Sequence, residues 1–243
     1  MKNKIKLLGF DFSAMGLNQT AEWILKNKGT VYCCTLNEVL AAEEDKNFRN
    51  VLNDGDLLTT DGMPLVWLMK LKTGKGERVY GPDILERFQK LDTKEKGKQF
   101  FIGDAKNEKY FRNFGDYLVL PYKDSFNDGD YKRIVGNIVK SRARVIWVGL
   151  GSKKQIIVAS ELKKRLPDRV YVTVGAAFDF LSGNKKQAPK WIRNIGGEWL
   201  YRLLMEPKRL TRRYLMVMGF LLKVLIGRIV REKGSGRCRR GKD

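Results

Sequence analysis

The residues best suited to acid–base chemistry lie in the stretch Thr59-Thr60-Asp61-Gly62-Met63-Pro64. The pattern predicts a strand over 56–60 that ends in two hydroxyls and a carboxylate, with Pro64 opening the next helix. Because the chain has no histidine, a general base must be a carboxylate or a less suited group, and Asp61 is the carboxylate best placed to take a proton from a reacting hydroxyl. Asp-Gly is also a common turn dipeptide, so a purely structural role for Asp61 stays open here.

Three further strand ends are candidates for holding substrate. Thr35-Leu36-Asn37 follows an expected strand. Asn37 is also a good helix cap, and that role alone would explain its presence. The run 149–155 has small residues, Gly149 and Gly151 among them, that let the backbone and the next helix N-terminus approach a diphosphate. Lys154 stands where a dinucleotide fingerprint has its third glycine. Gly103 closes a similar but shorter turn.

Metal ligands are sparse in this sequence. The Asp-x-Asp triplets 54–56 and 128–130 could hold the divalent metal of a nucleotide-sugar enzyme. Both precede an expected strand or helix, and their Asn-Asp-Gly contexts are typical of turns. Cys33, Cys34 and Cys238 form no CxxC pair. We therefore expect no metal and no cofactor, and the low, odd cysteine count favours a reducing compartment.

Short apolar runs alternate with helical patterns over the first three quarters of the chain. Strands are expected at 5–9, 30–35, 56–60, 99–103, 118–120, 144–149 and 169–174, and helices at 18–28, 37–45, 64–71, 82–91, 106–114, 131–141 and 154–166. Runs that are apolar on both faces suit buried parallel strands. The alternation predicts an α/β fold: an open, mostly parallel, Rossmann-like twisted sheet with helices on both faces. Ligands of such sheets bind at the carboxyl ends of the strands.

The positive charge is concentrated at the C-terminal end. The 243 residues include 48 Lys or Arg and 27 Asp or Glu, for a net charge of +21. Residues 185–243 hold 17 basic and 4 acidic residues, a net of +13, and are also rich in apolar side chains. We therefore predict an α/β catalytic domain over 1–184 and a basic, amphipathic helical appendage over 185–243.

The appendage has the pattern of a membrane-surface helix. Pro207 opens a helical pattern that is expected to run to about residue 232. On a helical wheel, basic residues lie near one side (Arg209, Arg213, Lys223, Arg231) and apolar ones opposite (Met218, Leu221, Leu222, Leu225, Ile229). Such a helix lies in the headgroups of an anionic membrane, although its apolar face could instead pack on the body or on a second copy. The stretch 237–242 is expected to be a disordered basic end.

The sequence offers no membrane-spanning stretch and no signal-peptide core. The apolar run after the first lysines stops at Asp11, and the run 214–227 is interrupted by Lys223. We expect a cytoplasmic protein that is peripheral on the inner face of a bacterial cell membrane.

Several stretches, taken in chain order, resemble the WecG/TagA/CpsF family of bacterial glycosyltransferases, glycosyltransferase family 26. They are residues 35–37, 60–64, 77–83, 148–155, 174–180, 188–191, 198–202, 206–210 and 212–214. One loop departs from the usual family pattern. Lys153 stands in place of a proline and Ile156 in place of a glutamate, whereas Gln155 is kept.

The resemblance implies an activity and a set of site residues. The reaction would move N-acetylmannosamine from UDP to the 4-hydroxyl of N-acetylglucosamine on diphospho-undecaprenol, with inversion and without metal, for the wall teichoic acid linkage unit or a related surface polymer. Matching positions imply Asp61 as the base and Thr35, Asn37, Arg78 and Gln155 as substrate contacts. They also imply that Arg202, Arg209 and Arg212 close over the site at the membrane.

Two other classes of function fit part of the sequence. The charge of +21 would suit a nucleic-acid-binding protein, but the basic segment is too apolar for a groove-reading helix and no helix-turn-helix, RNP or zinc pattern is present. The α/β pattern alone would suit an NAD-dependent oxidoreductase, but the glycine fingerprint is incomplete. We expect no nucleic-acid partner.

Overall fold

The computed structural model describes the backbone of residues 4–91, 97–121 and 123–237. The side chains of Asn194, Arg209, Leu225 and residues 227–237 lie outside that description. The chain divides into two compact units, residues 1–187 and 188–243.

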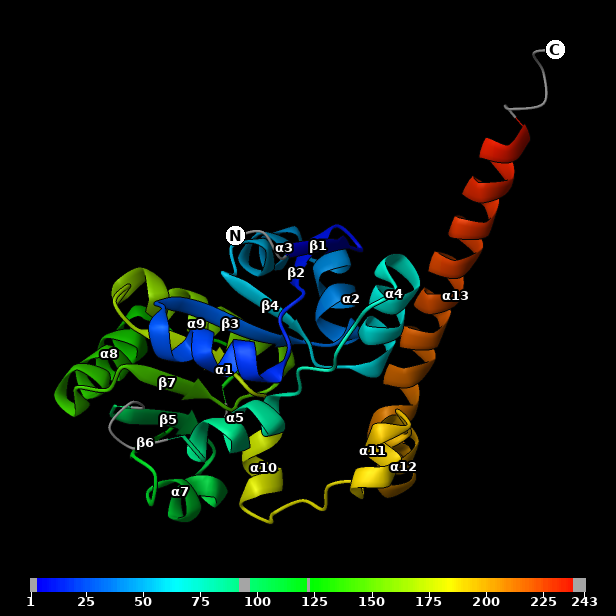
Figure 1. Ribbon diagram of the computed structural model, residues 1–243. Helices are drawn as coiled ribbons and strands as arrows, with labels where there is room; N and C mark the ends of the chain where they lie inside the picture. Colours follow the sequence, from blue (N-terminus) through cyan, green and yellow to red (C-terminus); the bar gives the residue numbers. More distant parts are fainter. Residues whose placement is uncertain (1–3, 92–96, 122, 238–243) are drawn as a thin grey trace. The chain divides into compact units, whose positions relative to one another are not determined.

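A twisted sheet runs through the first unit (Figure 1). Within the described ranges it has eight strands, in the order β1-β2-β4-β3-β8-β7-β5-β6. Their bounds are β1 Lys4–Leu7, β2 Phe10–Ser13, β3 Gly29–Cys34, β4 Leu57–Thr60, β5 Gln99–Gly103, β6 Asp116–Val119, β7 Val145–Val148 and β8 Val170–Thr173. β1 is antiparallel to β2, and the other strand pairs are parallel. The predicted α/β class with a mostly parallel sheet is confirmed.

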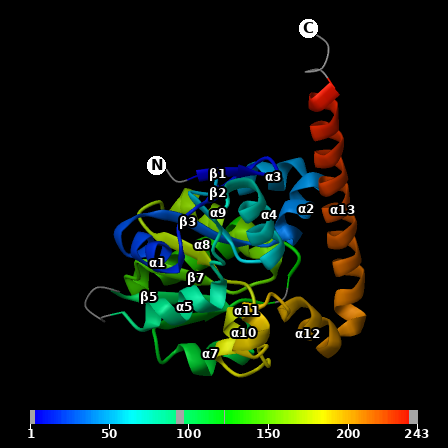
Figure 2. The same cartoon turned by 45° about the vertical axis from the view of Figure 1, so that its right-hand side comes forward.

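Helices cover both faces of this sheet (Figures 1 and 2). One face carries α1 Leu17–Lys26, α5 Gly81–Gln89, α7 Ala105–Phe111 and α10 Ala177–Leu181. The other carries α2 Leu36–Glu44, α3 Lys46–Asn53, α8 Asp128–Ser141 and α9 Ser152–Arg165, while α4 Met63–Thr73 lies beside β1 and β4. The central strands β3, β4, β7 and β8 are buried at every position, which explains why they are mostly apolar, with threonine as their polar residue.

The structure differs from the sequence-based prediction near the N-terminus. The strand expected at 5–9 is present as β1 but ends at Leu7, and β2 was not expected: a hairpin joins the two, with Leu7 opposite Phe10. Leu8 and Gly9 form the two-residue turn, with φ of 53° and 81°. Such a turn usually has Asn-Gly or Asp-Gly, so Leu-Gly gave no turn signal. The short helices α3 and α10 were also missed.

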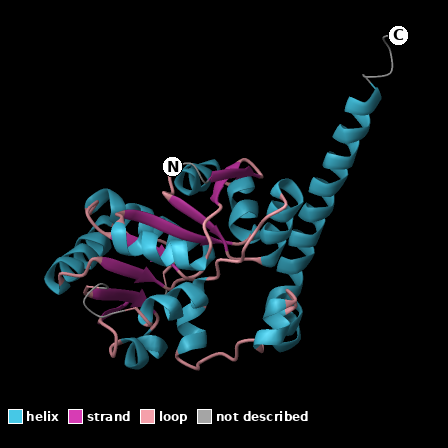
Figure 3. Ribbon diagram, viewed as in Figure 1, coloured by secondary structure: helices cyan, strands magenta, loops and turns pink. Residues whose placement is uncertain are grey.

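In its described part the second unit consists of helices joined by short loops (Figure 3). It contains α11 Lys190–Asn194, α12 Glu198–Met205 and α13 Pro207–Arg237. The rings of Trp199 and Tyr214 meet edge to face at 6.0 Å, which joins α12 to α13. α13 begins at Pro207 as expected and continues past residue 232; residues 238–243, including Cys238, lie outside the described part. None of the described helices is both long and apolar enough to span a bilayer.

Two glycines of one loop provide a test of this packing. A Cβ at Gly149 would lie 2.5 Å from the Phe178 ring, whereas a Cβ at Gly151 would meet nothing within 4 Å. We expect Gly149→Ala to lower the free energy of unfolding by about 1–3 kcal/mol through overpacking, and Gly151→Ala to change it by no more than about 0.5 kcal/mol. Urea unfolding of both variants measures this; equal stabilities would contradict the packing described.

Candidate active site

The register of the parallel strands brings the candidate loops to one edge of the sheet. Cys34 pairs with Thr60, so Thr35 and Asp61 leave adjacent strands at the same level. Val148 pairs with Thr173 on one side and Ile102 on the other, which places the loops after β7, β8 and β5 at that edge too. The loops singled out from the sequence therefore share one edge.

Asp61 is held by backbone on both sides. Its own N–H donates to the Cys34 carbonyl at 2.9 Å, which ties it to the end of β3. One carboxylate oxygen, Oδ2, accepts the N–H of Gly81 at 3.0 Å. Gly81 is the first residue of α5, so the positive end of that helix meets the carboxylate. Asp61 is partly exposed rather than buried. It is a fixed carboxylate at the mouth of the sheet rather than a simple turn residue.

Arg78 lies beside Asp61 and is held by three kinds of contact. The Thr60 hydroxyl donates to the Glu77 carbonyl at 2.8 Å, and the Thr59 hydroxyl to the Val79 carbonyl at 3.2 Å, so the backbone around Arg78 is fastened to the end of β4. Its Nε donates to the Asp61 carbonyl at 2.6 Å. Its guanidinium carbon lies 3.9 Å from the centre of the Tyr80 ring. The two hydroxyls noted in the sequence thus position Arg78.

Two glycines let the loops approach one another closely. A Cβ on Gly62 would lie 3.2 Å from the Cβ of Thr35, so the loops after β3 and β4 touch. A Cβ on Gly81 would lie 2.7 Å from the Val174 carbonyl, so the start of α5 lies against the end of β8. Any larger residue at Gly81 would force apart the segments that hold Asp61.

Thr35 and Asn37 belong to a closed polar cluster with Glu38. The Thr35 hydroxyl donates to Glu38 Oε2 at 2.7 Å and accepts from Asn37 N at 3.1 Å and Asn37 Nδ2 at 2.8 Å. Glu38 is a buried carboxylate that the sequence analysis missed. The sequence did contain a sign of this residue, because Thr35-x-x-Glu38 is the pattern of a capping box. The structure shows that capping box at the start of α2.

Gln155 and Ser152 connect the loop after β7 to its neighbours. Buried Gln155 accepts the Gly175 N–H through Oε1 at 2.9 Å, and the Ser152 hydroxyl donates to Glu38 Oε1. Lys153, the residue in place of the family proline, pairs with Asp45 at 2.6 Å, and Ile156 is fully buried. This loop is therefore fastened to α2, α3 and the loop after β8.

The glycines Gly103 and Gly149 have a packing role of their own. A Cβ on either would lie 2.9 Å or less from the Phe178 ring. Gly151 is exposed, with open space where a Cβ would be. Internal packing therefore explains why Gly103 and Gly149 are glycines, but it does not explain Gly151.

The two cysteines that end β3 are buried thiols next to the carboxylates. Burial is the main cause that raises the pKa of Cys33, and the charge of Asp61 adds to it. Burial likewise raises the pKa of Cys34, with the charge of Glu38 as the next cause. Both stay protonated at neutral pH and are poor nucleophiles. The carboxylates of this edge, not its thiols, are suited to proton transfer.

The acidic triplets have structural partners. Asp56 accepts the Thr30 N–H at 2.8 Å and pairs with Lys163 at 2.7 Å. Asp128 pairs with Arg165 at 2.8 Å and Asp130 with Lys123 at 3.0 Å. No group of three acidic or cysteine side chains in the described ranges is arranged to hold a metal ion.

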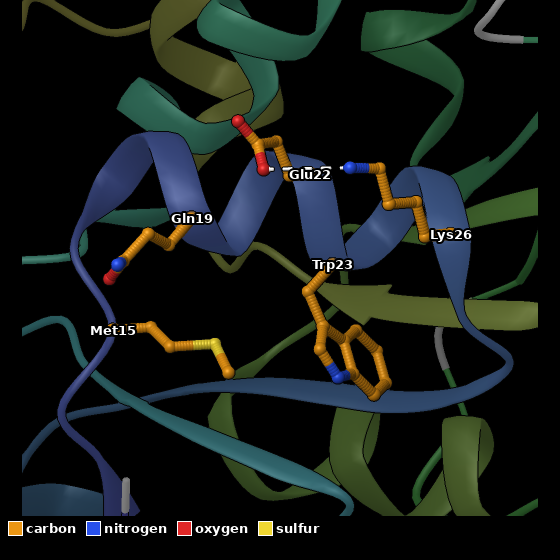
Figure 4. Close-up of a pocket in the computed structure, with 5 residues that line it drawn as sticks. All are labelled: Met15, Gln19, Glu22, Trp23 and Lys26. Atoms are coloured by element: carbon orange, nitrogen blue, oxygen red, sulfur yellow. Dashed lines mark ion pairs between the residues drawn. The ribbon is translucent and has the colours of Figure 1, made fainter.

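A separate hollow lies along α1 (Figure 4). It has a volume of about 250 Å³ and is lined by Met15, Gln19, Glu22, Trp23 and Lys26. Glu22 and Lys26 form an ion pair at 3.8 Å on the helix. The hollow shares no residue with the loops described above, and its one carboxylate, Glu22, is an exposed side chain paired with Lys26.

The predicted arginines of the C-terminal region belong to the second unit. Arg202 lies on α12 and is partly buried, and Arg212 lies on α13 and is exposed. Arg209 is in the first turn of α13, and its side chain lies outside the described part.

Comparison of the sequence with models of known protein families identifies the family of this chain. The model of the glycosyl transferase WecG/TagA/CpsF family matches residues 5–234. The chain belongs to this family. It is thus a glycosyltransferase of cell-surface polymer synthesis, and the edge that carries Asp61, Thr35 and Arg78 is its candidate active site.

Proposed function

We propose that this glycosyltransferase carries out the TagA-type reaction. It moves N-acetylmannosamine from UDP to the 4-hydroxyl of N-acetylglucosamine on diphospho-undecaprenol, with inversion and without a metal ion. Wall teichoic acid linkage-unit synthesis, or that of a related surface polymer, would use this step. The observation that carries the proposal is the fixed Asp61 carboxylate beside Arg78 and the Thr35 cluster in a chain of this family.

Asp61 is the proposed general base. The acceptor hydroxyl attacks the anomeric carbon, its proton passes to the Asp61 carboxylate, and the bond to the UDP oxygen breaks with its electron pair left on UDP. The Gly81 N–H and the start of α5 favour a carboxylate at this position, as a proton acceptor requires. The chain has no histidine, and two other carboxylates at this edge are less suited, since Glu38 is buried and Asp104 lies on the surface near Lys106. Asp61 is both held in place and partly exposed.

Cations are proposed to take up the charge that develops on UDP. Arg78 is held by Tyr80 and by the Asp61 carbonyl, so its guanidinium is ordered before substrate arrives. An ordered guanidinium binds phosphate oxygens through two parallel hydrogen bonds at little entropic cost. The resemblance adds Arg202, Arg209 and Arg212 to this role, and Thr35, Asn37 and Gln155 as substrate contacts. The glycine pattern of the loops after β5 and β7 adds Gly103, Gly149 and Gly151 to the proposed substrate-binding residues.

The second unit is the proposed membrane-binding part, which brings the enzyme to its lipid-linked acceptor. Leu215, Met218, Leu222 and Ile226 are exposed and spaced three or four residues apart, so they form one stripe on α13. Exposed Arg212 and Lys223 flank that stripe. Further exposed apolar residues are Trp191, Ile195, Leu200, Leu204 and Met205. Apolar stripes flanked by cations bind anionic bilayer surfaces.

The reaction class is tested with defined substrates. The protein is incubated with UDP-N-acetylmannosamine and a short-chain diphospho-N-acetylglucosamine, with and without EDTA, and released UDP and the disaccharide are measured. We expect acceptor-dependent UDP release that EDTA does not change. Reactions without acceptor, and with UDP-N-acetylglucosamine as donor, are the controls. Loss of turnover in EDTA with recovery in Mg²⁺ would contradict the metal-independent step.

The base is tested by Asp61→Asn. Since the amide cannot take the proton, we expect transfer to fall by about 10²–10⁴-fold, while UDP binding measured by calorimetry survives. Asp104→Asn is the matched control, because Asp104 follows β5 at the same edge and its side chain is about half exposed. Near-normal turnover of Asp61→Asn would remove Asp61 from the mechanism.

Membrane binding is tested by vesicle sedimentation. We expect the protein to bind phosphatidylglycerol vesicles, and Leu222→Asp to weaken binding by about tenfold or more because a buried leucine contributes about 1.5–3 kcal/mol. Val139→Asp, at an exposed apolar residue of α8, should bind as the unmodified protein does. Equal binding by both variants, or tighter binding to duplex DNA at physiological salt, would count against a membrane role.

A further inference from the structure

Glu38 is a buried carboxylate whose hydrogen-bond donors come from two different loops. It is 3% exposed. Oε2 accepts the N–H and the hydroxyl of Thr35, each at 2.7 Å. Oε1 accepts the hydroxyl of Ser152, the first residue of α9, although 114 residues separate the two in sequence. No ion pair to Glu38 is present in the part of the chain that the structure describes.

A buried carboxylate without a cation must be satisfied by hydrogen bonds, so its donors are held in fixed directions. The Thr35 hydroxyl has its proton directed to Glu38, which leaves the oxygen to accept from Asn37. The Ser152 hydroxyl is directed back across the sheet edge toward α2. A capping box needs only one bond to the Glu38 side chain, from the Thr35 N–H. The bonds from the Thr35 and Ser152 hydroxyls are not part of it. The Ser152 contact is therefore an addition to the cap.

Glu38 also closes a ring of contacts around the candidate site. Thr35 touches Gly62, and the Asp61 carboxylate binds Gly81, which lies against Val174. The next residue, Gly175, donates to Gln155 of α9. The hydrogen bonds that Ser152 and Thr35 donate to Glu38 close this ring of contacts.

We propose that Glu38 is a positioning residue for the transfer reaction. It fixes the first turn of α9 against the Thr35 loop, so that the loop after β7 keeps the spacing that the nucleotide sugar needs. This inference rests on the proposed function. Its effect falls on donor binding, because both loops that Glu38 joins are proposed donor contacts, whereas the Asp61 proton acceptor is held independently by Gly81.

Steady-state kinetics of two variants separate positioning from acid–base chemistry. In Glu38→Gln the amide oxygen can accept both Thr35 donors while the amide nitrogen donates to Ser152, so we expect kcat/KM within about fivefold of the unmodified enzyme. In Glu38→Ala the ring opens, and we expect the donor KM to rise about tenfold or more, with an unchanged acceptor KM and an unchanged pH profile of kcat. If Gln proves as damaging as Ala and the pH profile shifts, Glu38 does chemistry itself and the positioning role is wrong.

A double-mutant cycle tests the contact with Ser152. Ser152→Ala removes one of the three donors, so its rise in donor KM should be smaller than that of Glu38→Ala. Combining the two should add little to Glu38→Ala alone, because both act through the same bond. Multiplicative effects would show that the two residues act separately, which the proposal excludes.

The matched control is Asp56→Ala. Asp56 Oδ2 accepts the N–H and hydroxyl of Thr30 at 2.8 and 3.1 Å, at the opposite end of β3, so it repeats the Glu38–Thr35 arrangement away from the site. We expect it to lower stability without changing donor KM. If the donor KM rises equally in Asp56→Ala and Glu38→Ala, Glu38 only stabilises the fold and the positioning role is wrong.

Hydrogen exchange gives a readout that needs no substrate. The amides of Thr35 and of residues 152–154 should exchange about tenfold or more faster in Glu38→Ala and at normal rates in Asp56→Ala. If the unmodified enzyme fails to transfer N-acetylmannosamine but this exchange pattern is found, the proposed donor is wrong while the ring stands. If exchange at residues 152–154 is unchanged in Glu38→Ala, the inference fails whatever the activity.

Discussion

The in-register pairing of parallel strands is the constraint on which this site depends. Thr35 and Asp61 come from separate loops, and they meet because Cys34 lies opposite Thr60 in neighbouring strands. The same register across β8, β7 and β5 brings the other loops level with them. A shift of one residue in the β3–β4 pairing would turn every side chain of that strand to the opposite face. It would also separate the Asp61 N–H from the Cys34 carbonyl. The buried strands therefore determine the position of the Asp61 carboxylate, the proposed proton acceptor.

Much of the fold was predictable because its signals are local. The buried parallel strands are mostly apolar runs, and Pro64 marks the start of a helix as expected. The cap expected at Asn37 is wrong: the N-cap of α2 is Thr35, two residues earlier. The hairpin was missed because its turn is Leu8-Gly9, which forms with positive φ but lacks the usual Asn or Asp. Local signals fail where tertiary packing, rather than residue preference, stabilises a turn.

The site was predictable only in part, for the same physical reason. Asp61 could be singled out because it is a carboxylate at the end of a buried strand, although its Asp-Gly dipeptide left a structural role open. Glu38 carries the capping-box signal, but its bond to Ser152 depends on α2 and α9 sharing a face of the sheet, which no local pattern encodes. The glycines show the opposite limit: sequence cannot distinguish a glycine that admits a ligand from one, such as Gly149, that makes room for Phe178.

The electrostatics of the edge support the proposed roles of the basic segment in the chemistry and at the membrane. Two carboxylates, Asp61 and Glu38, lie where a doubly charged diphosphate is proposed to bind, and like charges repel strongly where water is excluded. Hydrogen-bond donors stabilise the negative charge of Glu38. The positive charge of Lys153 is already paired with Asp45. Arg78 alone supplies only one positive charge against the negative charges of the departing nucleotide. Residues 185–243 carry a net charge of +13, so the arginines of that segment are the natural supply of further positive charge. A segment that binds anionic lipid and also supports UDP departure would favour transfer where the lipid-linked acceptor is present.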